Sequence, residues 1–450
     1  MISRLAHRLA AIACFALLAT LQARPCVARP ELPDTLTLRS ALDLALIGHP
    51  DLRVAAAELA AARAESSFAR VPAFNPELEL QSARGGRTLG SGSEATLDVG
   101  VSQEFELWGK RAARQSVASA RAHSSSAALQ AKLQEVESGV RARFEHALYL
   151  QHGVVIVAEL AELDRRVVAA TQARVRDGSI TPVTGRLTEL DLLKLEAQGR
   201  RGRAEFRQAL VALSLAIGTE LPESMALRGD VQADTVRAPE DSIVAMALRV
   251  RATGEALARQ IATKRAELHL AEREARPNIT LGVGVSRERR AFSGEDFAGD
   301  PAIVGGIAGA TSTDKLWTAR VSAPIPLWQK NQAGRAQASA GIAQAQAEYD
   351  RYQLQTRLEV VGAIRRFADA TALYRLYLER STHVRQDLVL IHEAYADGRI
   401  PLDSYLTQKG RLVDTLLGQL DAGDGYWDAR AQLETAVGLD LADMNTRGAR

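Results

Sequence analysis

The chain has 450 residues, 46% of them hydrophobic, and its 56 basic and 54 acidic side chains give a formal net charge of +2. This balance excludes a nucleic-acid-binding protein that relies on general electrostatic attraction, because neutralising a phosphate backbone requires a surplus of clustered Lys and Arg. The apolar fraction is too high for a disordered chain. The length is enough for one large core or for two to three ordinary domains.

The first 28 residues have the features of a secretory signal peptide. Arg4, His7 and Arg8 precede an apolar run over 9–21, and small residues suited to cleavage follow the run. The run is shorter than the about 20 residues that a transmembrane helix needs, which favours a cleaved signal over a membrane anchor. We therefore predict a signal peptide over 1–28 and an exported mature protein.

The chain contains only two cysteines, Cys14 and Cys26, and both lie within the predicted signal peptide. A disulfide framework or a Cys-based zinc site in the rest of the chain is therefore excluded. Neither cysteine stands in a convincing lipobox, so attachment of a lipid at the N-terminus is an open alternative that the sequence does not favour.

An internal duplication organises the rest of the chain. Three short sequences recur 220 residues further along: Leu107-Trp108-Gly109-Lys110 as Leu327-Trp328-Gln329-Lys330, Asp177-Gly178-Ser179-Ile180 as Asp397-Gly398-Arg399-Ile400, and Ala216-Ile217-Gly218 as Ala436-Val437-Gly438. A constant offset means that no net insertion separates these landmarks. We predict two tandem repeats, over 29–218 and 240–439, joined by an inter-repeat segment over 219–239 and followed by a tail over 440–450.

Each repeat begins with two predicted strands on either side of a Gly-rich segment. Apolar and polar residues alternate in these segments, which is the pattern of a strand with one apolar face. In the first repeat the strands are expected at about 77–84 and 95–106, and in the second at about 278–286 and 316–326.

Very long helices follow the strands. The stretches 112–176 and 332–396 contain no proline, and we predict helices over about 108–176 and 328–396. At 1.5 Å per residue, such helices are roughly 100 Å long, which is far beyond the size of a compact domain. Shorter helices are expected over 183–217, 241–275 and 402–437.

Four strands with apolar faces cannot close a barrel in a membrane, because the smallest membrane barrels have about eight strands and an open edge is not tolerated in lipid. Two, three or four copies of the chain would supply eight, twelve or sixteen strands. The alternative on pattern alone is a soluble sheet beside a coiled coil.

Aromatic and basic residues mark the points where strand becomes helix. Trp108 and Trp328 stand at the level expected for interfacial aromatics, and Lys110, Arg111 and Lys330 follow at once. Because cations are disfavoured at a helix N-terminus, contact with anionic lipid head groups would explain their position. A solvated basic cap is the alternative.

The order of these elements resembles the outer-membrane factor family of TolC-type channels. The segments that carry the resemblance are Phe105-Glu106-Leu107-Trp108-Gly109-Lys110-Arg111, Pro324 to Gly334, and the two Gly turns, and the first two are most similar to the cobalt-zinc-cadmium efflux subgroup. The resemblance implies a mainly α fold with a small transmembrane β part. It also implies a homotrimer with a 12-stranded barrel in the outer membrane of a Gram-negative bacterium and a helical tunnel through the periplasm.

The resemblance also implies a function for the two turns that follow the long helices. They are expected to form the periplasmic tip, where the channel closes and a periplasmic adaptor (membrane fusion) protein docks. The residues concerned are Asp177, Gly178, Ser179, Ile180, Thr181 and Pro182 in the first turn and Asp397, Gly398, Arg399, Ile400 and Pro401 in the second. Thr184, Leu187, Ser404 and Thr407 stand where family members commonly carry acids, so we expect Asp177, Asp397 and Asp403 to form the gate instead.

No catalytic constellation, cofactor motif or metal-ligand spacing is present, and the eight histidines are scattered. We therefore expect no enzyme. The resemblance to the cobalt-zinc-cadmium subgroup implies a passive exit duct for divalent heavy-metal cations, driven by an inner-membrane RND-type pump. The same duct serving drugs, other organic molecules or secreted proteins is one alternative. A periplasmic coiled-coil adaptor or scaffold that never enters the membrane is another.

Overall fold

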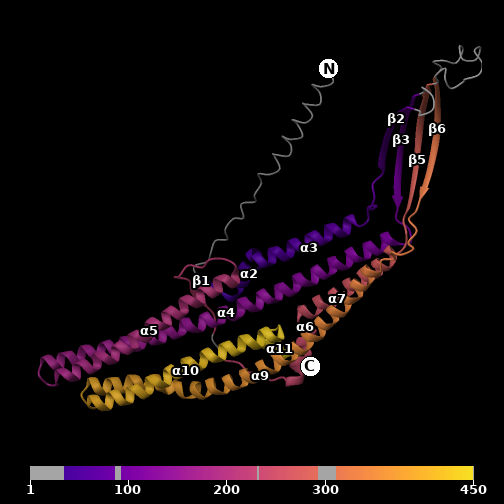
Figure 1. The fold of residues 1–450 in the computed structure, drawn as a ribbon. Coiled ribbons are helices and arrows are strands. Elements are labelled where there is room, and N and C mark those ends of the chain that lie inside the picture. The colour runs from indigo at the N-terminus through magenta and orange to yellow at the C-terminus, as the bar shows by residue number, and fades with distance from the viewer. Residues whose placement is uncertain (1–34, 87–92, 231–232, 292–310, 449–450) are drawn as a thin grey trace, which may run out of the picture.

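The computed structural model describes residues 35–86, 93–230, 233–291 and 311–448. Over these ranges the chain forms an elongated molecule, in which long helices continue at one end into a four-stranded sheet (Figure 1). The predicted signal peptide over 1–28 lies outside the described residues. No stretch of helix in the described ranges combines the length and the apolar character that a membrane-spanning helix needs.

Two very long helices run through the helical part. They are α4 (Lys110–Arg176), with 67 residues, and α9 (Gln332–Ala396), with 65 residues. Both begin slightly later than predicted, because Gly109 (φ 76°) and Asn331 (φ 53°) adopt the left-handed conformation, which separates each helix from the strand before it.

Shorter helices lie along the long ones, as Figure 1 shows. Along α4 lie α5 (Pro182–Ile217) at the end with the turn, and α3 (Pro50–Phe68) and α7 (Ala252–Glu274) nearer the sheet. Along α9 lie α10 (Leu402–Val437), α6 (Glu240–Val250) and α7. The short helix α2 (Leu38–Gly48) precedes α3, and α11 (Leu441–Gly448) follows α10.

The helix predicted over 241–275 is wrong in one respect, because it breaks at Arg251 into α6 and α7. Arg251 has an extended backbone (ψ 116°), and its guanidinium pairs with Glu359 of α9 at 3.2 Å. The backbone N–H of Ala252 is satisfied by the Gln134 side chain of α4 at 2.7 Å. Tertiary contacts thus replace the helical hydrogen bonds at this position, which local periodicity does not reveal.

The largest core cluster lies in the middle of the molecule, where α4, α6, α9, α10 and α11 meet. It is rich in aromatic residues, and Tyr426 of α10 is completely buried and stacks on Tyr374 of α9 with ring centroids 5.3 Å apart. A second cluster around Phe144 and Leu213 is closed by a short parallel pair, β1 (Thr35–Thr37) and β4 (Ala226–Arg228).

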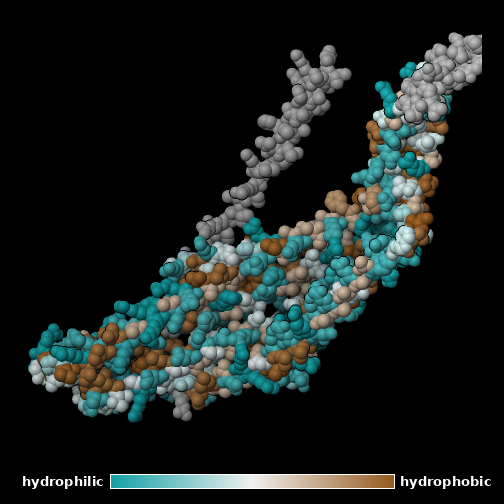
Figure 2. Space-filling model, in the orientation of Figure 1, coloured by the Kyte–Doolittle hydropathy of each residue, from teal (hydrophilic) through white to brown (hydrophobic). Residues whose placement is uncertain are grey.

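The sheet contains β2 (Glu77–Gly86), β3 (Ser93–Phe105), β5 (Ile279–Ala291) and β6 (Thr311–Ser322), in the order β2-β3-β5-β6. All three pairings are antiparallel, and β3 pairs with β5 across the two halves of the chain. Within the described residues β2 and β6 are edge strands. Figure 2 shows brown apolar side chains exposed along this sheet.

Two of the strands extend further than their apolar alternation indicates. β5 continues five residues beyond the predicted end at 286, and β6 begins five residues before the predicted start at 316. The reason is that the backbone ladder between them continues through charged residues as far as the pair Ala291 and Thr311. β6 ends at Ser322, shortly before Pro324 and Pro326, which have no N–H to donate.

Candidate functional site at the helical tip

The first predicted turn closes the hairpin between α4 and α5. Gly178 has φ 71°, a conformation that glycine adopts without a steric penalty, and the N–H of Ser179 donates to the carbonyl of Arg174 at 2.9 Å. Thr181 then caps α5, because its side chain accepts from the N–H of Thr184, and Pro182 is the first residue of the helix.

The second predicted turn closes the hairpin between α9 and α10 with nearly the same geometry. Gly398 has φ 74°, and the N–H of Arg399 donates to the carbonyl of Ala394 at 2.8 Å. Pro401 is the N-cap of α10, and Ile400 packs against Tyr405 in a small apolar cluster.

One side chain connects the two turns. Arg174 of α4 donates from Nη2 to the carbonyl of Ala396 at the end of α9, at 2.7 Å. Its guanidinium also lies 5.4 Å from the centre of the Tyr395 ring, which is within the range of a cation–π interaction. The two hairpins therefore end side by side, as Figure 1 also shows.

Tyr395 organises the contact behind the turns. Its ring stacks on Tyr405 of α10 at 4.8 Å, and its hydroxyl forms a 3.0 Å hydrogen bond with the Thr171 hydroxyl of α4. All three residues are buried. Burial raises the pKa of Tyr405 well above its ordinary value, so the phenol stays neutral and serves in packing and hydrogen bonding.

The three predicted gate acids, Asp177, Asp397 and Asp403, are all exposed near these turns. Asp397 forms a 2.5 Å ion pair with Arg399, so part of its charge is compensated within the turn. The backbone carbonyl of Asp403 accepts from Thr407, and its carboxylate faces solvent. Their position at a tip is consistent with a gate, although the role itself stays a prediction.

A buried charge cluster, which was not predicted from the sequence, lies deeper along the same helices. Lys409 of α10 reaches Asp164 of α4 at 2.5 Å and also bonds to Asp191 of α5. Lys409 and Asp164 have only 6% and 7% of their side chains exposed. Their sequence signal was a charged residue at an apolar helical position, since Tyr405, Lys409 and Val413 lie four residues apart on one buried stripe.

The predicted interfacial anchors at the strand-to-helix junctions have different surroundings. Trp108 is half exposed and donates from Nε1 to the carbonyl of Pro277 at 3.0 Å, and Trp328 is 83% exposed. Lys330 is exposed as well, whereas Arg111 donates to the carbonyl of Arg70. Lys110 is buried, and its ammonium group donates to Asn278 at 2.7 Å. Lys110 thus joins α4 to the residue directly before β5 and does not face outward.

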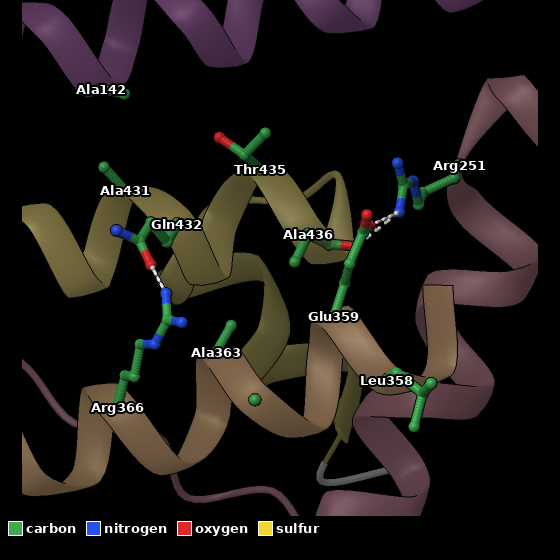
Figure 3. A pocket seen from close by; sticks show the side chains of 11 residues that line it. Ala142, Arg251, Leu358, Glu359, Ala363, Arg366, Ala431, Gln432, Thr435 and Ala436 are labelled. Carbon is green, nitrogen blue, oxygen red and sulfur yellow. Dashed lines mark hydrogen bonds and ion pairs between the residues drawn. The ribbon is translucent and has the colours of Figure 1, made fainter. Parts of the chain in front are cut away.

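A cavity of about 610 Å³ lies near the break between α6 and α7 (Figure 3). Its charged side chains and Gln432 are already paired with each other, because Arg251 bonds to Glu359 and Arg366 bonds to Gln432 at 2.7 Å. Among the described residues no group of three His, Cys, Asp or Glu side chains has an arrangement that could hold a metal ion.

A second buried ionic cluster connects α4 to α10 in the middle of the molecule. Arg430 bonds to Glu434 at 3.0 Å and lies 3.6 Å from Glu145, and one carboxylate oxygen of each glutamate is buried without a hydrogen-bond partner. Burial, together with repulsion from Glu434, raises the pKa of Glu145 to about 7.

Comparison with known proteins identifies the family. The family model for outer membrane efflux proteins matches residues 41–219 and 246–439, which is most of the chain. The chain belongs to the outer membrane efflux protein family. It is therefore an outer-membrane efflux channel protein that extends into the periplasm, and members of this family are passive channels that act with a periplasmic adaptor and an inner-membrane pump.

Individual relatives agree with this assignment. The cobalt-zinc-cadmium resistance protein CzcC of Cupriavidus metallidurans is 24% identical over 322 residues, which is 71% of this chain and 70% of CzcC. The crystal structure of CusC superposes with a TM-score of 0.66 at 17% identity, covering 89% of this chain and 92% of CusC. The outer membrane channel CmeC of Campylobacter jejuni gives a TM-score of 0.67 at 15% identity, covering 92% of this chain and 89% of CmeC.

Proposed function

We propose that this efflux protein is the passive exit duct of a tripartite heavy-metal efflux system and conducts divalent cations as a homotrimer. The observation that carries the cargo assignment is the similarity to CzcC over 71% of the chain, because CzcC is a cobalt-zinc-cadmium resistance protein. The duct itself requires no tight metal site, since strong coordination would slow the release of the ion.

The edges of the sheet support the trimer. β2 and β6 each leave a row of backbone groups unpaired, and such groups are costly in lipid. Pairing β6 of one copy with β2 of the next removes both edges. Three copies then give a closed barrel of twelve strands, and the helices continue it as a tunnel in which the two tandem repeats occupy equivalent places around the axis.

The helical tip supports the docking of the adaptor. Both loops at the tip present small or polar residues to solvent. Beside the first of them, α5 carries the exposed apolar side chains Val183, Leu187, Leu190 and Leu193. A surface that is apolar along the helix and polar at the turn suits a helical-hairpin partner that meets it end to end. The inner-membrane RND-type pump would act through this adaptor.

A deletion strain tests the cargo. We expect the strain to become sensitive to some of the zinc, cadmium, cobalt, nickel, copper and silver salts, and to keep its resistance to antibiotics and detergents. Restoring the wild-type gene should restore growth. Sensitivity confined to organic compounds would reject the metal assignment and favour export of drugs or other organic molecules by the same channel.

Cysteine cross-linking tests the trimer. The chain has no cysteine beyond Cys26, so introduced cysteines are unique in the mature protein. Leu80→Cys on β2 combined with Ala319→Cys or Val321→Cys on β6 should yield covalent dimers and trimers on oxidation. Val99→Cys on the inner strand β3 in place of Leu80→Cys is the matched control and should give none. A monomeric protein in the periplasmic fraction would instead favour the scaffold alternative.

A further inference from the structure

The pleat of the sheet separates its side chains into two chemically different faces. One face, here called the apolar face, carries a band of hydrophobic residues from all four strands, in which Leu80, Val99, Val285 and Trp317 are register partners. Leu80, Val99 and Trp317 are exposed, and Val285 is half-buried. On β3 the band runs from Phe105 to Leu97, which is roughly 27 Å along the strand, and Gln103 is its one polar residue. This length matches the apolar belt of about 25 Å in outer-membrane barrels.

Four basic residues lie on the same face directly beyond the band, at the end of the sheet away from the helices. Arg287 pairs in register with Leu97 on one side and with Lys315 on the other. Two residues further on, Arg84 and Arg289 flank the small Ala95. Arg287, Arg289 and Lys315 belong to the parts of β5 and β6 that the apolar alternation did not predict, whereas Arg84 lies at the predicted end of β2. We call Arg84, Arg287, Arg289 and Lys315 the basic patch.

The acids among the described residues do not balance the charges of the basic patch. All four side chains are exposed, and within the described ranges none of them takes part in an ion pair. The neighbouring acids Glu94, Glu288 and Asp314 lie on the opposite, polar face, because they alternate with the patch along their strands.

The polar face provides an internal comparison. Its two arginines are both neutralised, since Arg290 bonds to Glu288 at 2.8 Å and Arg320 bonds to Glu79 at 3.3 Å. On the apolar face, by contrast, Arg287 and Lys315 stand directly opposite each other, and like charges at such positions destabilise a sheet. An external anion beside the patch would remove this repulsion.

The position of the patch beside the apolar band restricts the chemical class of this anion. Charged side chains on a lipid-facing strand are tolerated near the interface and not at the midplane, so the patch marks one surface of the membrane. A partner that touches both the band and the patch must have an apolar part and an anionic part next to each other. An amphiphilic lipid with a phosphate-bearing head group has this composition.

We propose that the basic patch binds the phosphate groups of outer-leaflet glycolipids and so anchors the channel at the outer surface of the membrane. The inference rests on the proposed function, in which the sheet closes into a barrel with its apolar face toward lipid. The patch is at the outer surface because the helices extend from the other end of the sheet into the periplasm. The basic patch thus lies at the opposite end of the sheet from the predicted anchor Lys110, whose ammonium group bonds to Asn278 inside the protein.

The experiment compares the full-length channel with the variant Arg84→Gln, Arg287→Gln, Arg289→Gln and Lys315→Gln. Binding is measured on phosphatidylcholine vesicles that contain either diphosphoryl lipid A or the same lipid after removal of its phosphates, and inorganic phosphate is added in a third arm. We expect the wild type to prefer the phosphorylated lipid at least about tenfold and to lose this preference at high salt. The variant should lose the preference at low salt.

Two further variants keep the test decisive. Replacing Arg53, Arg63, Arg207 and Arg357 by Gln changes the net charge equally in the helical part, and this variant should keep the preference. Replacing the three patch arginines by Lys preserves the charge. This variant should keep the preference for the phosphorylated lipid, and it tests the patch even if the Gln variant folds poorly. An unchanged preference for the phosphorylated lipid in a folded Gln variant would overturn the proposal. Equal binding of inorganic phosphate and of the phosphorylated lipid by the wild type would overturn it as well.

The oligomer on gels without heating is recorded in parallel. A channel that inserts as a trimer but shows no lipid preference refutes only the basic patch. A chain that forms no membrane-inserted oligomer refutes the proposed function as well.

Discussion

Lys409 and Asp164 form a 2.5 Å ion pair across the boundary between the two helical hairpins, in a position where both side chains are almost fully buried. Asp191 bonds to the same ammonium group, so one lysine of α10 holds both helices of the other hairpin. Burial raises the pKa of Asp164, while the charge of Lys409 acts against this. The packing of the helices near the tip therefore depends on the buried charge of Lys409.

We expect Lys409→Met to destabilise the helical part by about 3–5 kcal/mol, because it leaves two carboxylates without their cation. Thermal unfolding of the purified channel measures the effect. The triple variant Lys409→Met, Asp164→Asn, Asp191→Asn should recover part of the stability, since it removes the uncompensated charge. Lys194→Met, at an exposed position of α5, is the control and should be nearly neutral. An equally neutral Lys409→Met would contradict the prediction.

Arg174→Ala should loosen the contact between the two turns, because it removes the hydrogen bond to Ala396 and the cation–π contact with Tyr395. The loss is expected to be about 1 kcal/mol and to appear as more frequent opening in planar bilayer recordings. Arg176→Ala, two residues further along, removes the same charge at an exposed position and is the control. Identical recordings for both variants would show that Arg174 does not hold the tip.

Replacing Asp397 and Asp403 by Ala should raise single-channel conductance or the leakage of large antibiotics, because these acids are expected to help hold the tip shut and to attract cations. Asp403→Ala is expected to reduce cation selectivity more than Asp397→Ala, since Arg399 compensates Asp397. Asp414→Ala, an exposed change further along α10, serves as the control. Unchanged conductance, leakage and selectivity in the double variant would reject the gate.

The stability of the channel should rise as the pH falls from about 7 toward about 4.5, because of Glu145. Its pKa is about 7 in the folded protein against an ordinary value of 4.5, so the folded state binds this proton more tightly than the unfolded state. The carboxyl is protonated in both states below 4.5 and in neither above 7, which gives a total change of roughly 3 kcal/mol.

Glu145→Gln removes the titrating group, so the stability of this variant should change little between about pH 4.5 and about pH 7. Heat dissociation of the oligomer at about pH 5 and about pH 8 measures the difference. Glu137→Gln, on the same helix, is the control, and its profile should follow the wild type. A wild-type slope of opposite sign would contradict the assignment to Glu145.

Much of the fold was predictable because its signals are local and repeated. Proline-free stretches gave α4 and α9 within a few residues, and Gly178 and Gly398 marked the turns because a left-handed residue at a helix end favours glycine. The family resemblance was also visible in the sequence, and it is confirmed by the match to the outer membrane efflux protein family. The break at Arg251 was not predicted, because its causes lie on α4 and α9.

The sequence by itself determined the element types, the turn positions and the family. The first two depend on residues close together in the chain, and the family follows from the order of such local motifs along it. Only the tertiary structure decided which charges are used inside the protein. Lys110 and Lys409 are both buried basic residues in helices, and they bond to Asn278 and Asp164, which lie 168 and 245 residues away in the chain. Arg287 and Lys315, in contrast, are exposed and have no ion-pair partner among the described residues. The physical reason is that the cost of a charge depends on its partners and on solvent, and folding brings these together from distant parts of the chain.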